Sequence, residues 1–285
     1  MTADMAADEA SERGVADRPA QAGRELSMAD RVVVVTGAAG GIGAALARRM
    51  ADLGARVVVS DLDGERAHAV AEEIGGTLVA GDAASEDGVA ALVETVEDLL
   101  GPIDVWFANA GVDLGQGLDS AESDWARSWD VNVMAHVRAA RLLVPGWLER
   151  GEGWFVSTAS AAGLLTMIDA PAYSVTKHGA VSFAEWLSVT YRHKGIRVHT
   201  ICPQGVQTAM LERSGALAEV LGRDRVLTPD EVADATWEAM VDGRFLVLPH
   251  PEVGDYYRAR AGDTDAWLGG MNRLQRRFEG VLDRR

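Results

Sequence analysis

Short runs of β-branched and aromatic residues alternate with longer helical patterns along the chain after Asp30. This alternation is typical of a parallel sheet that is covered by helices on both faces. The strand candidates are residues 31–36 (RVVVVT), 56–60 (RVVVS), 77–80 (TLVA), 104–108 (DVWFA), 154–158 (WFVST), 197–201 (RVHTI) and 245–248 (FLVL). The pattern therefore predicts an α/β fold, a doubly wound, seven-stranded parallel sheet with helices on both faces.

Helix boundaries carry the expected capping residues. Ser85 opens a helical run that ends at Leu100, and Thr228 followed by Pro229 opens another. Beyond Pro249, five apolar residues are spaced for one face of a helix: Trp267, Met271, Leu274, Phe278 and Val281. We assign residues 250–285 to a C-terminal helical extension of the main domain. Its apolar face is open to three interpretations: packing on its own domain, a lid over a functional site, or a contact with another subunit.

The first 28 residues are polar, acidic and rich in alanine, and they lack the basic region and apolar core of a signal peptide. They also lack an apolar stretch long enough to span a membrane. Because Met28 directly precedes the first strand candidate, we expect residues 1–28 to be a disordered extension. The main domain would then cover residues 29–249.

Charge and cysteine usage exclude several classes of function. A net charge of −16 would repel nucleic acid and anionic membranes, so we expect neither as a partner. The single cysteine, Cys202, lies in the apolar run VHTICP and is expected to be a buried thiol. The lack of a disulfide framework fits a cytoplasmic protein. His193 and His199 do not have metal-ligand spacing, so we expect no metal.

A glycine-rich turn links the first strand candidate to a helical pattern, in the sequence VVVVTGAAGGIGAALARRM. Glycines in this context allow a tight turn and a close approach of the backbone to a pyrophosphate at a helix N-terminus. We assign this role to Gly37, Gly41 and Gly43, with Ile42 between the last two. A turn without a ligand would not explain its position between the first strand and the first helix.

Acidic residues follow the second and third strand candidates. Asp61, about 20 residues after the glycines, is placed to accept hydrogen bonds from the ribose of adenosine and to repel the additional phosphate of NADP. The alternative for Asp61 is that it only forms a turn and does not contact a cofactor. Asp82 is a candidate contact for the adenine edge or, alternatively, the N-cap of the next helix. These residues favour NAD(H) as the cofactor.

Several motifs occur together in a fixed order: TGAAGGIG (36–43), Asp61, ANAG (108–111), DVNV (130–133), STASAAG (157–163), YSVTK (173–177) and CPQGVQT (202–208). In this order and spacing, residues 29–249 resemble the short-chain dehydrogenase/reductases. The glycine loop alone fits both TGxxxGxG and TGxxGxxG. The 13-residue separation of Ser160 and Tyr173, with the ANAG motif, resembles the classical subfamily.

The resemblance implies a Rossmann-like NAD-binding catalytic domain with the catalytic residues Asn132, Ser160, Tyr173 and Lys177. Tyr173 would exchange a proton with the substrate oxygen as a hydride moves to or from the nicotinamide. A tyrosine titrates near pH ~10, so work near neutrality needs a pKa that is lower by roughly 2 to 3 pH units. Lys177, on the same helical face, and the positive nicotinamide ring of NAD⁺ are expected to contribute to this shift. Ser160 would hold the substrate oxygen. Asn132 would fix a helix kink and a water beside Lys177.

The resemblance also extends the cofactor site. Relatives that use NADP often carry a basic residue directly before the second glycine of the loop, and Gly40 stands there, which again favours NAD(H). The further cofactor contacts that we expect are Leu62, Asp82, Ala83, Asn109, Ala110, Gly111, Tyr173, Lys177, Pro203, Val206 and Thr208. Gln204 stands where the family usually has glycine, so the geometry of this turn is open and Gln204 is a candidate substrate contact.

Residues that follow these motifs are expected to line the substrate pocket. They are Val112, Leu165, Met167, Gln204 and Met210, with Leu114, Leu164, Ile168 and Leu211 beside them. Such a lining favours an apolar or aromatic secondary alcohol, or its ketone. A hydrolase triad of Ser160, His178 and Asp169 is excluded because the G-x-S-x-G motif is absent, and His178 is expected at the surface or at an interface.

The sequence thus predicts an NAD(H)-dependent oxidoreductase that interconverts an apolar or aromatic secondary alcohol and its ketone. The alternatives are an NADPH-type reductase of C=O, C=N or C=C bonds and a non-catalytic dinucleotide-binding regulator. The complete catalytic set argues against the regulator. The resemblance implies a homodimer or homotetramer with the helices of Asn132 and Tyr173 at the main interface.

Overall fold

The computed structural model describes residues 26–213 and 225–283. Most of the predicted N-terminal extension therefore lies outside the described residues. Met28, which we assigned to that extension, is 1% exposed and packs in the hydrophobic core, where Leu26 packs against it. The folded part of the chain thus begins before the predicted boundary at residue 29, because these apolar side chains are buried.

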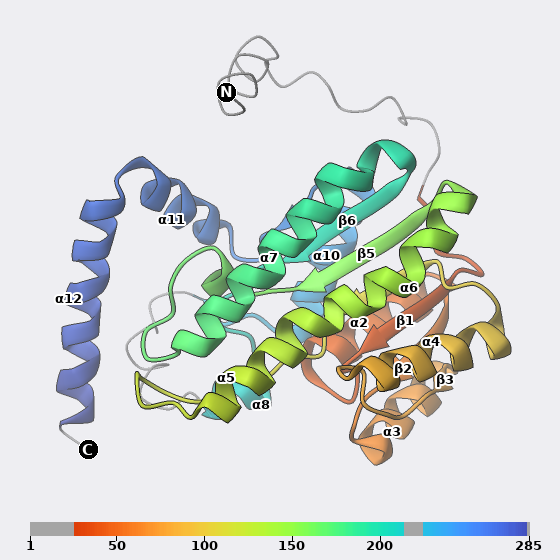
Figure 1. Cartoon of the computed structure of the whole chain (residues 1–285), viewed down its shortest axis with the longest axis horizontal. Coiled ribbons are helices and arrows are strands. Elements are labelled where there is room, and N and C mark those ends of the chain that lie inside the picture. Colours follow the sequence, from red (N-terminus) through yellow and green to blue (C-terminus); the bar gives the residue numbers. More distant parts are fainter. Residues whose placement is uncertain (1–25, 214–224, 284–285) are drawn as a thin grey trace, which may run out of the picture.

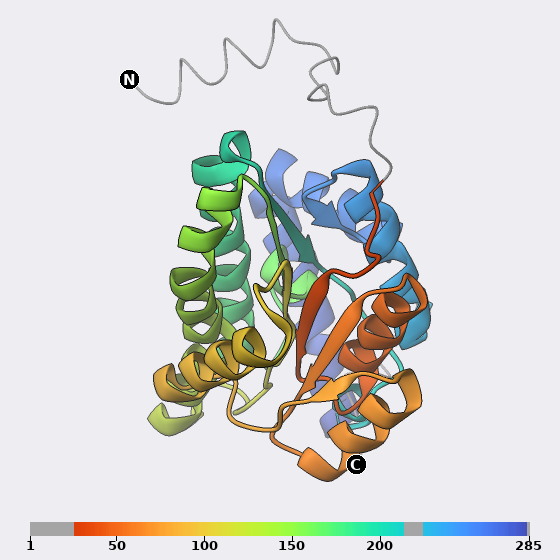
Figure 2. The same cartoon turned by 90° about the vertical axis from the view of Figure 1, so that its right-hand side faces the viewer.

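In the described part of the chain, seven parallel strands form one sheet in the order β3-β2-β1-β4-β5-β6-β7 (Figures 1 and 2). They are β1 (Val32–Thr36), β2 (Arg56–Ser60), β3 (Thr77–Leu78), β4 (Val105–Ala108), β5 (Gly153–Thr158), β6 (Ile196–Ile201) and β7 (Leu246–Val247). The predicted doubly wound sheet is confirmed. The edge strands β3 and β7 have only two residues each, since each pairs with one neighbour.

Helices cover both faces of the sheet. On one face lie α2 (Gly41–Asp52), α3 (Gly64–Ile74) and α10 (Pro229–Asp242). On the other lie α4 (Glu86–Leu100), α6 (Ala135–Arg150) and α7 (Pro171–Tyr191). The further helical segments are α5 (Glu122–Trp129), η1 (Asp130–Met134), η2 (Ala161–Gly163), η3 (Arg192–Lys194), α8 (Ala209–Arg213), α11 (Pro251–Gly262) and α12 (Thr264–Leu282).

The predicted elements form because their side chains fill both cores. In β1, Val33 and Val35 pack into the core beneath α2, whereas Val32 and Val34 pack into the opposite core. Successive side chains of a strand point to opposite faces, so a run of valines suits a strand that is buried on both. Ser85 caps α4, as the sequence predicts, by accepting a hydrogen bond from the Gly88 N–H at 3.1 Å.

The C-terminal extension forms two helices. Figure 1 shows α11 and α12 (blue) at one end of the molecule, beyond the two helical layers, with α12 at the outer edge. Among the residues that the structure describes, no helix is both long and apolar enough to cross a membrane.

The order of the strands creates a crevice. Strands β1 and β4 are neighbours in the sheet, although β2 and β3 separate them in the sequence. The chain proceeds outward from β1 to β3 in one direction and from β4 to β7 in the other. In open α/β sheets, ligands bind at the carboxyl ends of the strands where this direction reverses.

Candidate active site

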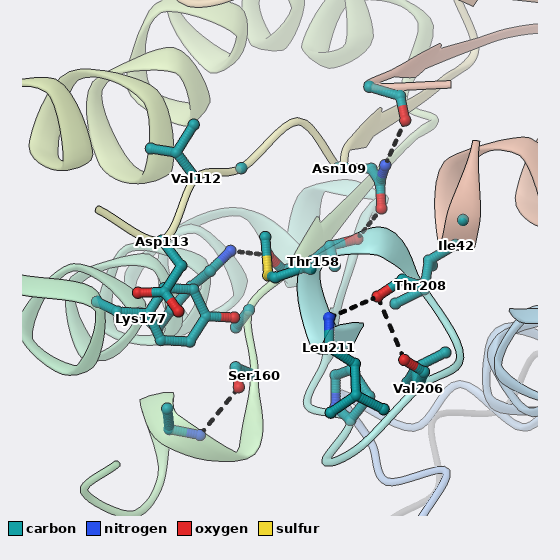
Figure 3. A pocket seen from close by; sticks show the side chains of 18 of the residues that line it. Ile42, Asn109, Val112, Asp113, Thr158, Ser160, Lys177, Val206, Thr208 and Leu211 are labelled. Atoms are coloured by element: carbon teal, nitrogen blue, oxygen red, sulfur yellow. Dashed lines mark hydrogen bonds between the residues drawn. The ribbon is translucent and has the colours of Figure 1, made fainter. Parts of the chain in front are cut away.

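A cavity of about 800 Å³ lies at this end of the sheet (Figure 3). The catalytic candidates Ser160, Tyr173 and Lys177 line it, but Asn132 does not. The predicted cofactor and substrate residues also line it: Gly37, Gly41, Ile42, Gly43, Asp61, Leu62, Asp82, Ala83, Asn109, Ala110, Gly111, Val112, Leu165, Met167, Pro203, Gln204, Val206, Thr208 and Met210. Segments far apart in the sequence therefore meet around one site.

The glycine loop fits the pyrophosphate of a dinucleotide. Gly37 and Gly41 have φ angles of 64° and 54°, in the left-handed region that favours glycine. A Cβ on Gly43 would lie 2.1 Å from the carbonyl oxygen of Gly37, so this turn closes only without a side chain there. Helix α2 begins at the loop with no side-chain cap and no acidic residue in its first turn. Its first N–H groups and its dipole can therefore hold an anion.

Asp61 braces the glycine loop. Its Oδ2 accepts a hydrogen bond from the Ala39 N–H and its Oδ1 accepts one from the Asp63 N–H, both at 3.0 Å. A carboxylate has further acceptor positions, so these bonds are compatible with the predicted contact to ribose hydroxyls.

Arg66 is a cavity residue that the sequence reasoning missed. A Cβ on Gly40 would lie 2.7 Å from the Arg66 Nη2, and Arg66 lines the cavity. A basic side chain therefore lies against the glycine loop although none is present at position 40, and Gly40 does not by itself indicate NAD. The available signal was the cap of α3: Asp63 accepts a hydrogen bond from the Arg66 N–H, which places Arg66 in the first turn beside Asp61.

Asp82 and Ala83 lie at the cavity after β3. The Asp82 Oδ1 accepts a hydrogen bond from the Ala84 N–H at 2.9 Å. The alternative that Asp82 caps the next helix is wrong, because Ser85 caps α4. Asp82 stays a candidate contact for the adenine edge.

Asn109 ties the ends of β1, β4 and β5 together. Its Nδ2 donates to the carbonyls of Thr36 at 3.0 Å and Gly37 at 3.1 Å, and its Oδ1 accepts a hydrogen bond from the Thr158 hydroxyl at 3.0 Å (Figure 3). Two residues further on, a Cβ at Gly111 would lie 3.1 Å from the Lys177 Nζ. The ANAG motif therefore lines the part of the cavity next to Lys177, where we expect the cofactor to bind.

Asn132 lies where the helix formed by α5 and α6 is interrupted. Residues Asp130–Met134 form a π-helical turn, and such turns distort the α-helical hydrogen-bonding pattern. The fully buried Asn132 accepts from the Val112 N–H and donates to the Val112 carbonyl, both at 2.9 Å. It also donates to the Thr176 hydroxyl at 3.0 Å. Asn132 thus joins the loop after β4 to helix α7, one residue before Lys177.

Ser160, in the turn between β5 and η2, comes together with Tyr173 and Lys177 of α7. The Lys177 Nζ donates to the Thr158 carbonyl at 2.8 Å (Figure 3). It lies 5.6 Å from the centre of the Tyr173 ring. The Ser160 Oγ accepts from the Ala162 N–H at 3.1 Å and also hydrogen-bonds with the Tyr173 side chain. All three side chains face the same cavity.

Burial is the largest influence on the pKa values of Tyr173 and Lys177. Burial raises the pKa of Tyr173 to about 12, while the hydrogen bond from Ser160 lowers it and the charge of Asp113 raises it. Burial also lowers the pKa of Lys177 to about 8. Without a cofactor the tyrosine is therefore held in its protonated form, because burial disfavours the charged phenolate. The predicted lowering of the pKa includes the positive ring of bound NAD⁺ and stays a prediction. Asp113 lines the cavity and was missed by the sequence reasoning.

The turn after β6 is held by His250. The Gln204 N–H donates to the His250 Nδ1 at 3.2 Å, and the His250 Nε2 donates to the Arg225 carbonyl at 3.0 Å. His250 is 1% exposed. Gln204 does not have a left-handed backbone, so the turn needs no glycine at this position. The Thr208 hydroxyl donates to the Val206 carbonyl at 3.2 Å (Figure 3).

The substrate side of the cavity is apolar, as predicted. Ile168 and Leu211 line it, but Leu114 and Leu164 do not, and Leu164 is instead a buried core residue. The C-terminal helices contribute four lining residues that the sequence reasoning did not assign to the pocket: Tyr256, Trp267, Met271 and Leu274. The signal for three of them was the apolar spacing along α12.

His178 does not lie free at the surface. Its Nδ1 lies 2.8 Å from the Ser174 carbonyl oxygen and its Nε2 lies 3.1 Å from the Arg260 Nη1 on α11. His178 is half-buried, and its contact with the C-terminal extension is one that sequence spacing could not show.

Known proteins are similar to this chain in both sequence and fold. Residues 31–217 match the family model described as short chain dehydrogenase. The 1-deoxy-11-beta-hydroxypentalenate dehydrogenase of Streptomyces exfoliatus is 36% identical over 251 residues, which cover 85% of this chain and 90% of that protein. The cyclohexanol dehydrogenase of Acinetobacter sp. (strain SE19) is 33% identical over 236 residues, which cover 79% of this chain and 94% of that protein. The crystal structure of a short-chain dehydrogenase/reductase from Burkholderia phymatum in complex with NAD matches with a TM-score of 0.76 and 28% identity, covering 85% of this chain and 96% of that one.

Proposed function

Because this chain belongs to the classical short-chain dehydrogenase/reductase family, we propose that it is an NAD(H)-dependent oxidoreductase. It interconverts an apolar or aromatic secondary alcohol and its ketone. The observation that carries this proposal is the meeting of Ser160, Tyr173 and Lys177 in a cavity that also contains the glycine loop and an apolar side.

The side chains have separate roles in this proposal. The Tyr173 hydroxyl exchanges a proton with the substrate oxygen, and the Ser160 hydroxyl orients that oxygen by a hydrogen bond. Lys177 contributes positive charge and a donor one helical turn from Tyr173. Asn132 holds the loop of Val112 against α7 and so keeps this geometry. A bound nicotinamide dinucleotide would accept or supply the hydride and, when oxidised, would add a positive ring charge near the tyrosine.

The choice of NAD over NADP rests on Asp61. Its carboxylate, fixed by Ala39 and Asp63, would repel a phosphate on the adenosine ribose. Arg66 favours the alternative, an NADPH-type reductase, because its guanidinium lies beside the same loop. We give Asp61 the larger weight because it directly follows β2, where the ribose is bound in this fold. The neighbour from Burkholderia phymatum was crystallised with NAD.

Steady-state kinetics with each cofactor test this choice. The wild type should prefer NAD, and Asp61→Ala should reduce that preference, because the repulsion of the phosphate is removed. Arg66→Ala should have the opposite effect and raise the KM for NADP. A native preference for NADP would contradict the proposed role of Asp61.

The apolar lining supports the proposed substrate class. Leu165, Met167 and Met210 line the substrate side, and residues of this kind bind carbon skeletons rather than sugars or charged acids. The name of one relative, cyclohexanol dehydrogenase, describes an apolar secondary alcohol. A panel of secondary alcohols and ketones, followed by the absorbance of the reduced nicotinamide, tests this. Turnover confined to sugars or to charged acids would contradict it.

The proposal extends to the assembly and the location of the protein. We propose a cytoplasmic homodimer or homotetramer whose subunits meet through the helices around α7. Val175, Trp186 and Val189 on α7 are between 48% and 82% exposed, and Trp129 and Leu142 on the neighbouring helices are also exposed. Light scattering coupled to size-exclusion chromatography should give two or four subunits, and a monomer would contradict this part of the proposal.

A further inference from the structure

The C-terminal helices form one side of the substrate cavity. Trp267, Met271 and Leu274 line the cavity from α12, and they lie on one face of that helix. At its far end Phe278 and Val281 pack against Ile168. The intervening residues of α12 are mostly exposed, and in Figure 1 this helix lies at the outer edge of the molecule. The apolar face of α12 therefore faces the cavity over Trp267, Met271 and Leu274, and its far end packs against the loop that carries Ile168.

Tyr256 and Trp267 form an aromatic corner on the side of the cavity that is lined by the C-terminal helices. The rings of Tyr256 on α11 and Trp267 on α12 lie 6.3 Å apart, tilted by 41°, and both line the cavity. Three methionines from different segments line the same cavity: Met167, Met210 and Met271. Aromatic rings and flexible thioethers together suit a bulky carbon skeleton of irregular shape.

Arg260 fixes the C-terminal helices to the catalytic part of the chain. Its Nη1 donates to the Leu164 carbonyl and lies 3.1 Å from the His178 Nε2. Because the His178 Nδ1 lies 2.8 Å from the Ser174 carbonyl oxygen, we assign the ring proton to Nδ1, which leaves Nε2 to accept from the arginine. His178 follows Lys177 directly on α7, and Leu164 precedes the loop that lines the substrate side. The Arg260 side chain thus connects α11 with helix α7 and with the segment that precedes the loop on the substrate side.

We propose that α11 and α12 form the second wall of the substrate site, that this wall selects bulky, polycyclic apolar alcohols over small ones, and that Arg260 is the positioning residue that holds it. The inference rests on the proposed oxidoreductase function and adds a size class to its substrate. A small alcohol would contact the side chains near Ser160 and Tyr173 without reaching the aromatic corner, so only a large substrate gains from that wall.

The wall is tested with Trp267→Ala and with Leu268→Ala as the matched control. Leu268 is the next residue on the same helix, but it is 55% exposed and does not line the cavity. For a tricyclic secondary alcohol, Trp267→Ala should lower kcat/KM by about 10-fold or more, mainly through KM, because a large apolar contact is lost. For cyclohexanol, and for the KM of NAD, it should have little effect. An equal loss for both alcohols would overturn the selection by size.

The positioning role is tested with Arg260→Gln and with Arg258→Gln as the matched control. Arg258 lies on the same helix, but it is 74% exposed and pairs with Asp255. Hydrogen–deuterium exchange should accelerate over residues 164–168 and 251–282 in Arg260→Gln and stay at the wild-type rate in Arg258→Gln. An unchanged exchange rate in Arg260→Gln would overturn its role. This readout does not depend on turnover.

A binding measurement separates this inference from the proposed function. Calorimetry of the NADH-bound protein with both alcohols should show that Trp267→Ala weakens binding of the tricyclic alcohol alone. If neither alcohol is oxidised by the wild type but this difference is present, the proposed reaction fails and the wall stands. If both alcohols are oxidised but Trp267→Ala binds them as the wild type does, the wall fails and the proposed function stands.

Discussion

The ammonium of Lys177 should lose its proton near pH 8. The side chain is 2% exposed, and its Nζ donates to the neutral carbonyl of Thr158, which does not replace the water that burial removes. Burial therefore lowers the pKa of Lys177 from 10.5 to about 8, although the negative charge of Asp113 raises it in part. At about 1.4 kcal/mol per pH unit, this difference corresponds to a cost of about 3 kcal/mol for the charged lysine in the folded state.

The cost predicts how stability depends on pH. Below pH 8, folded and unfolded chains both carry the charged lysine and the folded state bears the whole cost. Between pH 8 and 10.5 the unfolded chain binds more protons than the folded one, so the free energy of unfolding rises with pH. When the pH rises from 7.5 to 9.5, the free energy of unfolding of the wild type should therefore increase by about 2 kcal/mol more than that of Lys177→Met. Tyr173 and Cys202 titrate in the opposite sense, but both proteins contain them, so their contribution cancels.

Two measurements check this prediction. The chain has only two lysines, Lys177 and Lys194, so labelling with ¹³C-lysine gives two Cε signals, which Lys194→Arg assigns. The Lys177 signal should titrate near pH 8. Urea unfolding at the two pH values gives the stability difference, with Lys194→Met as the control. A Lys177 signal that titrates above pH 10, or a constant difference between wild type and Lys177→Met, would refute the reasoning.

Three further predictions follow from the same site. Asn132→Ala removes three hydrogen bonds of a fully buried residue, so the free energy of unfolding should fall by about 3 kcal/mol in urea titrations. The charge of Asp113 raises the pKa of Tyr173, so Asp113→Asn should move the pH dependence of alcohol oxidation, which needs the phenolate, to lower pH in a kcat/KM profile. His250→Phe removes the hydrogen bond that holds the Gln204 backbone, so the KM for NADH should rise several-fold while small-alcohol selectivity stays unchanged.

Each of these has a contradicting outcome. A loss below about 0.5 kcal/mol in Asn132→Ala would mean that its hydrogen bonds are replaced by others. Asp119→Asn is the control for Asp113, since Asp119 is exposed on the same loop. A pH profile that shifts equally in both variants would exclude a specific effect on Tyr173. An unchanged KM in His250→Phe would show that the turn keeps its geometry without the histidine.

The sequence predicted the central strands well because they are buried on both faces and therefore consist mostly of consecutive apolar residues, as in Val32–Thr36. It predicted the edge strands too long, since Val79 and Ala80 follow Leu78 with the same hydrophobic pattern but without a partner on the outer side. Val79 is half-buried and Ala80 is exposed, so at this edge the hydrophobic pattern continues beyond the paired segment.

Within the site, residues carried by short motifs were predictable and residues carried by tertiary packing were not. Asn109 and Asp61 lie where motif spacing indicates. Arg66 and Trp267 line the cavity, and His250 holds the Gln204 backbone beside it. Local patterns place the first two on helices, but their approach to the cavity depends on how those helices pack. The desolvation that raises the pKa of Tyr173 in the cofactor-free chain was likewise not predictable, because spacing shows the nearby lysine but not the burial of the phenol.

The central claim is that Tyr173 exchanges the proton with the substrate. Tyr173→Phe removes only the phenolic oxygen from a residue that is 8% exposed, so the fold and the cofactor site should be retained. The account predicts that kcat falls by about 10²- to 10⁴-fold with the preferred alcohol while the Kd for NADH is unchanged. Turnover at the wild-type rate in Tyr173→Phe, with NADH bound normally, would contradict it.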